Sequence, residues 1–326
     1  MQKDGIINGE TVAAAVLLIK EGALKLTASE KVAEQIVASD YFAYDPFRAN
    51  QTRQLIQSVQ LMDLTSLVGG ESREVIEQLC HMALHPLHPD LVSEGHLVSL
   101  KDIRTAAVCL YPECIPFAKE YFDKHVPGSG GRPAIATVTG FPSGSAPIAD
   151  KLKETAAAAA AGADEIDIVI DKSQVLDGKW RQLYDEMRQA KELCTRMSVK
   201  LKVILKTGDL GSYDNIYKAS MVCMFAGADF IKTSTGKETV NATLETGIVM
   251  TTAIRDYHMM TGIRVGFKPA GGIRTAADAL QWSSLMNRQL GTEWMSPNLF
   301  RFGASSLLQS LDQELQSCIN CEYKST

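Results

Sequence analysis

The chain has 326 residues, of which 45% are apolar and 22% charged, and its formal net charge is −5 at pH 7. This composition supports a sizeable core, and the absence of a long basic run argues against a nucleic acid or an anionic membrane as the main partner. Length alone permits one large domain or two ordinary ones, because α/β barrels often exceed about 250 residues.

The N-terminal region is predicted to be helical. Val12–Ala23 and Ser29–Ser39 are rich in helix formers, and Tyr44-Asp45-Pro46 ends the pattern. The apolar run Val12–Ile19 lacks a cleavage-like site and falls short of the ~20 residues that span a bilayer, so it predicts a buried helix. We therefore expect residues 1–50 to form a helical extension of a soluble, cytoplasmic protein.

The cysteines and histidines give no sign of a metal or disulfide framework. Seven cysteines are scattered, mostly in apolar segments, which favours reduced thiols. Cys318 and Cys321 form a CxxC pair, but it lacks a βαβ setting and a second ligand pair. His81, His85 and His88 have ligand-like spacing, yet two nearby prolines break any shared helix face. We expect no metal.

From about residue 57, short apolar runs alternate with helical stretches. Eight such units favour a single α/β domain, a (β/α)8 TIM barrel over 57–316, with a flexible tail over 319–326. An open doubly wound sheet is the alternative, but nothing marks the reversal of strand order that it needs. The apolar runs lie near 57–63, 104–110, 133–139, 163–170, 199–206, 228–232, 263–268 and 298–303.

An internal repeat supports this count. The sequence Ala-Gly-Ala-Asp at 161–164 recurs at 226–229, each time between a helix and an apolar run, and its glycine suits a helix C-cap. Asp167 and Lys232 each lie three residues beyond the repeat, on the fourth and sixth strands. Because alternate strands of a barrel contribute side chains to one interior layer, we expect this carboxylate and this amine to face each other near the C-terminal rim.

Lys232 and Lys268 each stand where a strand meets its loop, at the end of the barrel that holds active sites. Two close ammonium groups repel each other, so at least one is expected to become neutral and nucleophilic, able to form a Schiff base with a carbonyl. The alternative is that both are exposed loop residues. The sequence predicts an enzyme that works through Lys232. Asp167 would transfer protons, or would simply pair with a buried lysine.

Two glycine-containing loops predict a phosphate site. They follow strands 7 and 8, where barrels commonly bind phosphate, and the second opens a helix whose N–H groups attract anions. Each glycine alone is typical of a turn, but together they favour phosphate. The candidate phosphate-binding residues are Gly236, Gly271, Gly272, Gly303, Ser305 and Ser306.

Lys202 and Lys206 lie four residues apart on the fifth apolar run, so a continuous strand would point both the same way. If they point inward, Lys202 lies deep in the barrel, where it would pair with Glu165 or Asp167. We predict a supporting role for Lys202 in substrate binding.

Three further residues end the first two strands. Asp63 is a candidate to hydrogen-bond a substrate hydroxyl, with Thr65 beside it, although Asp63 is equally suited to cap a helix. Cys109 ends strand 2. At the mouth it would be open to alkylation by reactive aldehydes, but packing in the core explains it as well.

Five motifs resemble the deoxyribose-phosphate aldolase family, and the likeness runs from about Val59 to Leu311. The resemblance implies that Lys232 forms the Schiff base, that Lys268 keeps its amine neutral and that Asp167 belongs to the proton relay. It also implies phosphate contacts at the six residues named above. The motifs are 136–142 (ATVTGFP), 165–169 (EIDIV), 232–236 (KTSTG), 266–274 (GFKPAGGIR) and 302–306 (FGASS).

The implied reaction is the reversible cleavage of 2-deoxy-D-ribose 5-phosphate to D-glyceraldehyde 3-phosphate and acetaldehyde. An iminium on Lys232 would accept the electrons, so no cofactor is expected. The implied partners are small phosphorylated sugars and aldehydes, and a homo-oligomer is compatible with the family. Another sugar-phosphate class I aldolase and a non-catalytic sugar-phosphate-binding barrel are the alternatives.

The resemblance leaves two features of the chain open. The N-terminal 50 or so residues exceed the short bacterial form of the family and look like its longer subgroup. The short form ends in a tyrosine that transfers protons, whereas Tyr323 is followed by three more residues.

Overall fold

The structure is a computed structural model in which residues 48–89, 91, 102–126 and 131–323 are described. Both helices expected before Tyr44 lie outside the described residues, and so do residues 324–326. Among the helices of the described parts, none is long and apolar enough to cross a membrane.

Eight parallel strands form a barrel, as the alternating pattern predicts. Strands β1 to β7 pair in chain order, and β1 also pairs with β8. Bridges from Phe267 to Phe300 and from Ala270 to Gly303 bring the two edges together, so the alternative of an open sheet is wrong. The strands are β1 Met62–Thr65, β2 Ala107–Leu110, β3 Ala134–Thr139, β4 Glu165–Val169, β5 Lys200–Ile204, β6 Phe230–Lys232, β7 Gly266–Lys268 and β8 Phe302–Ala304.

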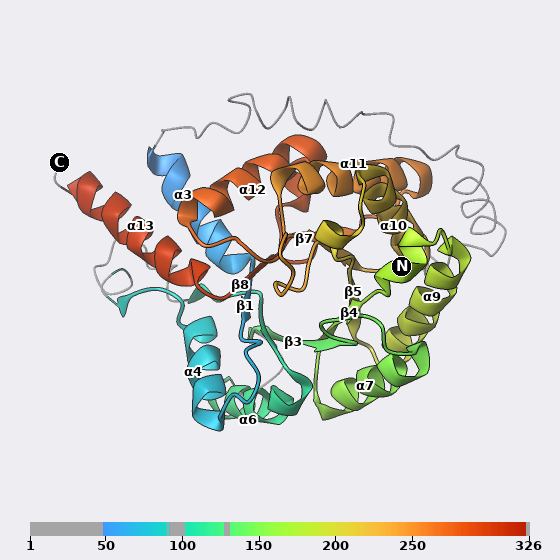
Figure 1. Ribbon diagram of the computed structural model, residues 1–326. Helices are drawn as coiled ribbons and strands as arrows, with labels where there is room; N and C mark the ends of the chain where they lie inside the picture. The colour runs from blue at the N-terminus through green and yellow to red at the C-terminus, as the bar shows by residue number, and fades with distance from the viewer. Residues whose placement is uncertain (1–47, 90, 92–101, 127–130, 324–326) are drawn as a thin grey trace.

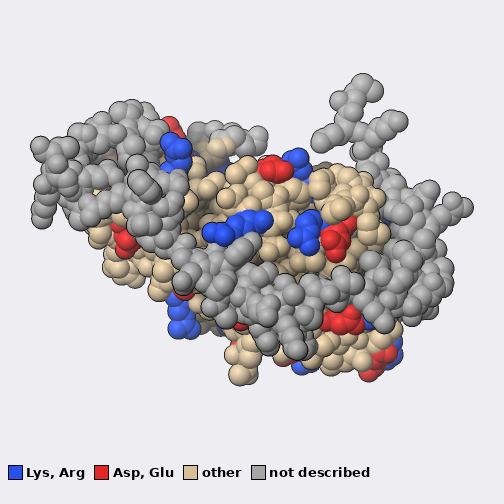
Figure 2. Space-filling view, turned by 90° about the horizontal axis from the view of Figure 1, so that it is seen from above, with Lys and Arg blue, Asp and Glu red and all other residues tan. Residues whose placement is uncertain are grey.

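Helices surround the barrel, and α3 and α13, from opposite ends of the described chain, pack against each other (Figure 1). On the side that carries α11 and α12, the coloured basic and acidic side chains stand in small separate groups (Figure 2). The helices are α3 Arg48–Gln60, α4 Arg73–Leu84, α6 Ile115–His125, α7 Ile148–Ala161, α8 Lys172–Leu176, α9 Trp180–Arg196, α10 Tyr213–Phe225, α11 Leu244–Thr261, α12 Ala276–Leu290 and α13 Leu307–Tyr323, with short 3-10 turns η3 Pro112–Cys114, η4 Thr207–Asp209 and η5 Thr292–Trp294.

Two expected boundaries differ from the structure. The apolar run at 57–63 is mostly the end of α3, because Leu55 and Val59, four residues apart, bury one face of that helix, and β1 begins only at Met62. The tail expected from residue 319 starts inside α13, which continues to Tyr323.

The Ala-Gly-Ala-Asp repeat follows a helix in both copies, but its glycine is the C-cap only in the first, because Ala226 caps α10 and Gly227, with φ of 100°, comes after it. Gly162 ends α7 with φ of 111°. The aspartates that follow accept hydrogen bonds from the neighbouring strand: Asp164 from Ile135 N at 2.7 Å, and Asp229 from Leu201 N at 2.8 Å. Strands β4 and β6 therefore start in equivalent positions, which brings Asp167 and Lys232 to equivalent heights.

An aromatic ring fills the interior of the barrel at the end where the strands begin, called the lower end below. A Cβ atom on Gly266 would lie 2.4 Å from the ring of Phe230, so the ring occupies the space that a side chain on β7 would need. Glycine at this position lets Phe230 lie across the barrel beneath the charged residues described next.

Candidate active site

Seven ionisable side chains meet inside the barrel above Phe230. All are almost completely buried, and they come from six of the eight strands or the residues next to them. Buried charges are costly unless they are paired, so their arrangement decides what the site can do. The seven are Asp63, Glu165, Asp167, Lys202, Lys232, Lys268 and Arg301.

Asp167 lies at the centre of this cluster. Its Oδ2 atom accepts hydrogen bonds from Nζ of Lys232 and Nζ of Lys268, each at 2.8 Å, and its Oδ1 atom accepts one from Lys202 at 2.8 Å. Burial acts to raise the pKa of this carboxyl, but the three ammonium groups together hold it well below its ordinary range. The carboxylate and amine predicted to face each other are therefore in direct contact.

Lys268 lies between two carboxylates. Its Nζ atom donates to Asp63 Oδ2 as well as to Asp167 Oδ2. Burial acts to lower the pKa of Lys268, yet the charges of Asp167 and Asp63 outweigh it and raise that pKa above its usual value. The two lysines at the mouth thus share a carboxylate oxygen, and Lys268 is held as an ammonium.

Lys232 has the fewest carboxylate contacts of the three lysines. Lys202 reaches three carboxylates within 4 Å and Lys268 two, whereas Lys232 contacts Asp167 alone. With every group ionised, the cluster holds four cations and three carboxylates. The cluster therefore has one more cation than anions, and Lys232 is the lysine with the fewest carboxylate partners in it.

Asp63 and Thr65 have partners inside the protein, and the helix-capping alternative for Asp63 is wrong. Asp63 has no exposed surface, and its carboxylate is taken up by Lys268 and Arg301. It caps no helix, since α4 begins after Ser72. The hydroxyl of Thr65 donates to the carbonyl of Asp63 at 2.8 Å. Asp63 therefore supports Lys268 from below.

Lys202 lies deep in the barrel, as its position on β5 suggested. It donates to Asp167 and pairs with Glu165 Oε2 at 2.7 Å. Its carboxylate neighbours raise its pKa despite burial, which acts in the opposite direction. Lys202 has no exposed surface, and its partners in the structure are the carboxylates of the cluster; its predicted role in substrate binding stays a prediction.

Lys206 does not point the same way as Lys202. Strand β5 ends at Ile204, and Lys206 adopts a left-handed conformation with φ of 59°. Its ammonium donates to the carbonyl of Pro142 at 3.3 Å and lies 3.5 Å from Asp209. The expectation of one continuous strand was wrong here, because the chain turns out of the sheet two residues earlier.

Cys109 lies in the core. It packs with Ala107, Ala136 and Val138 and has no exposed surface, and burial raises the pKa of its thiol. Cys109 is thus buried, as the packing alternative expects, and the charges of Lys268, Asp167 and Lys232 act on its thiol, so it lies beside the cluster.

The loops after β6 and β7 turn on glycines that face open space. Gly236 and Gly272 have φ of 86° and 87°, and nothing lies within 4 Å of a Cβ atom built on either. Gly271, with φ of 82°, approaches Asn241 so closely that a Cβ atom would lie 2.7 Å from it. These backbones can adopt such turns without strain, and they leave room for a ligand at the rim.

The loop after β8 combines packing with an open helix start. A Cβ atom on Gly303 would lie 2.8 Å from that of Ala270 and 3.2 Å from Cε of Lys268, so this glycine makes room for the lysine. Ser305 and Ser306 are exposed immediately before α13, a helix of 17 residues. N–H groups at such a helix start are suited to an anion.

Sequence reasoning missed three basic residues. Lys237 and Arg274 are exposed and follow Gly236 and Gly272 within two residues, so they add positive charge to the glycine loops. Arg301 lies inside the eighth apolar run between Phe300 and Phe302. An arginine flanked by two buried phenylalanines was the available signal that this position points into the barrel.

The rim also contains buried polar atoms that lack a partner among the described residues. They are Ser234 Oγ and Asn241 Oδ1, after β6, and Thr207 Oγ1, after β5. Buried polar atoms normally form hydrogen bonds, so these positions suit contacts with a bound molecule or water.

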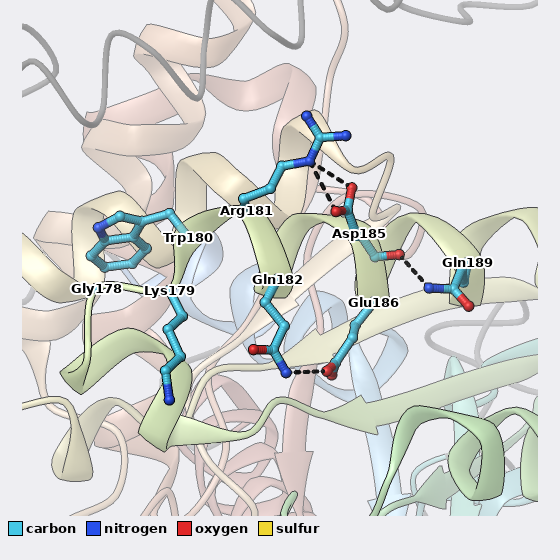
Figure 3. A pocket seen from close by; sticks show the side chains of 8 residues that line it. All are labelled: Gly178, Lys179, Trp180, Arg181, Gln182, Asp185, Glu186 and Gln189. Atoms are coloured by element: carbon cyan, nitrogen blue, oxygen red, sulfur yellow. Dashed lines mark hydrogen bonds and ion pairs between the residues drawn. The ribbon is translucent and has the colours of Figure 1, made fainter.

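A separate hollow of about 490 Å³ lies beside the start of α9 (Figure 3). The charged side chains that line it are paired locally: Arg181 Nε donates to Asp185, and Gln182 donates to Glu186 at 3.1 Å. It does not include the charged cluster inside the barrel. In the described part of the chain, no group of three His, Cys, Asp or Glu side chains could hold a metal ion.

The fold and this cluster define a class of protein, the barrel lyases in which a lysine amine activates a carbonyl group, known as class I aldolases. A family model described as DeoC/LacD family aldolase matches residues 57–311, and the chain belongs to this family.

The chain is similar to curated deoxyribose-phosphate aldolases. It is 46% identical to those of Homo sapiens and Mus musculus over 274 residues, which is 84% of this chain and 84% of each relative. The solved tetrameric structure of deoxyribose phosphate aldolase from Aeropyrum pernix superposes with a TM-score of 0.60 at 21% identity, covering 83% of this chain and 99% of that one. That likeness supports the barrel fold.

Proposed function

We propose that this protein is an aldolase that reversibly cleaves 2-deoxy-D-ribose 5-phosphate to D-glyceraldehyde 3-phosphate and acetaldehyde, with Lys232 as the Schiff-base lysine. The observation that carries the proposal is the amine of Lys232. It lies at the top of the charged cluster, retains 3% exposure and has Asp167 as its one carboxylate contact. The 46% identity to curated deoxyribose-phosphate aldolases supports this choice of sugar.

In the cleavage direction, neutral Lys232 attacks the C1 aldehyde of the open-chain sugar, and loss of water forms an iminium. A base removes the proton of the C3 hydroxyl, the C2–C3 bond breaks, and its electron pair moves into the iminium to give an enamine. Glyceraldehyde 3-phosphate leaves. Protonation of the enamine at C2 and hydrolysis then release acetaldehyde and the free amine.

Asp167 and Lys268 are suited to move these protons. The pKa of the Asp167 carboxyl lies below its ordinary value, and Lys268 donates a hydrogen bond to this carboxylate at 2.8 Å. A water molecule between this pair and the substrate would complete the relay. Asp63 and Lys202, both without exposed surface, fix the position of the pair.

The phosphate group is assigned to the rim formed by the loops after β6, β7 and β8. The backbone N–H groups there would bind the phosphate oxygens, and Lys237 and Arg274 would balance their charge. The residues proposed to contact the phosphate are Gly236, Gly271, Gly272, Gly303, Ser305, Ser306, Lys237 and Arg274.

The test is to incubate the protein with acetaldehyde, reduce it with borohydride and locate the adduct by peptide mass spectrometry. Reduction of the imine should leave an ethyl group on Lys232, and 2-deoxyribose 5-phosphate added beforehand should compete. Turnover of this sugar phosphate, compared with other sugar phosphates and with EDTA present, identifies the substrate class. No adduct, or an adduct on Lys268 alone, would overturn the assignment.

We also expect a homo-oligomer in the cytoplasm. The Aeropyrum pernix relative is tetrameric, and five cysteines of the barrel and its helices are buried thiols outside any disulfide, as expected in a reducing compartment: Cys80, Cys109, Cys114, Cys194 and Cys223. Light scattering of the purified protein and fractionation of its host cells would check these two points.

A further inference from the structure

Arg301 and Glu165 form a second pair of opposite charges below the three lysines. Arg301 Nη2 donates to Glu165 Oε1 at 2.8 Å and Nη1 to Oε2 at 3.2 Å, which is a two-pronged contact. The guanidinium also lies 5.6 Å from the centre of the Phe230 ring. Both side chains are nearly fully buried, so water screens their charges little.

Two short paths of contacts join this pair to the amine of Lys232. Arg301 donates to Asp63, whose other carboxylate oxygen binds Lys268. Glu165 binds Lys202 at 2.7 Å. Both lysines then meet on Asp167, at 2.8 Å each. The pair therefore touches neither the mouth nor the nucleophile, but its charges act on the same carboxylate that holds Lys232.

We propose that Arg301 and Glu165 are positioning residues that set the pH at which Lys232 becomes a nucleophile. The positive charge of Arg301 disfavours an ammonium at Lys232, and the negative charge of Glu165 favours it. This inference rests on the proposed role of Lys232 as the Schiff-base lysine. It extends the active site to a buried layer beneath the proposed nucleophile.

The other charged and titratable groups around the amine must be held constant for a test. They are Asp63 from β1, Cys109 from β2, Asp167 from β4, Lys202 from β5 and Lys268 from β7, with Lys200 at the lower rim, 3.8 Å from Glu165. None of them changes in the variants described next, so a shift would report on the Arg301–Glu165 pair alone.

The experiment measures borohydride trapping of acetaldehyde on Lys232 between pH 5 and 10. In Arg301→Gln the pH midpoint of trapping should rise by roughly one unit, and in Glu165→Gln it should fall by a similar amount. This is the effect of one charge over about 10 Å at an effective dielectric constant of about 20. Arg301→Lys keeps the charge, and the double glutamine variant removes both, so each should keep a midpoint near that of the wild type.

A purely structural role predicts lower yield or activity but no midpoint shifts of opposite sign. The matched control is Arg132→Gln, which breaks a two-pronged pair with Asp164 outside the barrel interior and should leave the midpoint unchanged. Equal midpoints in Arg301→Gln and Glu165→Gln would overturn the inference. If Arg301→Gln fails to fold, Glu165→Gln and the double variant still decide. Absence of trapping in the wild type would instead refute the proposed function.

Discussion

Replacement of Lys268 by methionine tests the central hydrogen-bonded pair. The variant leaves Asp63 with Arg301, and Asp167 with Lys202 and Lys232, so neither carboxylate loses every partner. Removing one member of a buried pair costs about 3–5 kcal/mol, and the remaining partners place this loss near about 3 kcal/mol. We expect a folded protein with a clearly lower urea midpoint.

The same change should slow Schiff-base formation at pH 7 by roughly 10- to 100-fold. Without Lys268, the Oδ2 atom of Asp167 is left to Lys232, which favours the ammonium form of the nucleophile. Stopped-flow measurement of acetaldehyde trapping would give this rate. Recovery at pH 9 would assign the loss to charge, and a persistent loss in turnover would assign it to proton transfer.

Lys151→Met is the matched control for this experiment. Lys151 is equally buried, but it lies on α7 and donates to the carbonyl of Val169 at 3.0 Å, away from the carboxylates of the cluster. It should lower stability and leave the trapping rate unchanged. An unaltered rate and stability in Lys268→Met would refute our reasoning about the pair.

Three further outcomes are expected. The folded protein keeps the pKa values of Asp63, Glu165 and Asp167 low, so below about pH 4 the unfolded chain binds protons that the folded protein does not. Urea titrations should therefore show full stability at pH 6 and a loss of unfolding free energy approaching about 4 kcal/mol per pH unit near pH 3. A stability that does not change with pH in this range would contradict this. Gly303→Ala should reduce kcat/KM at least about tenfold by displacing Lys268, and wild-type kinetics would argue against that contact. The buried thiol of Cys109 should resist iodoacetamide in the native protein and react in urea, as peptide mapping would show.

The sequence was sufficient to predict the barrel and the upper half of the site, which consists of Asp167, Lys232 and Lys268. The repeat placed Asp167 and Lys232 on alternate strands at equal height, and a regular barrel converts equal height into contact. Lys268 was recognisable because it ends an apolar strand next to small residues. These inferences needed only spacing along single strands.

The lower half of the site, around Asp63 and Arg301, forms only when the first and last strands meet. The spacing of residues along one strand does not show which side chains this closure brings together. Asp63 meets Lys268 and Arg301 across 205 and 238 residues of sequence, and neither partner is marked by a local motif. The turn at Lys206 was missed for another reason. A left-handed conformation in a residue other than glycine is imposed by its surroundings and not by its side chain.

The contact between Asp63 and Arg301 joins the first and last strands of the barrel. Loss of either residue would leave a buried charge with fewer partners, which is costly. The groups that are proposed to perform the chemistry therefore also hold the two ends of the barrel sheet together.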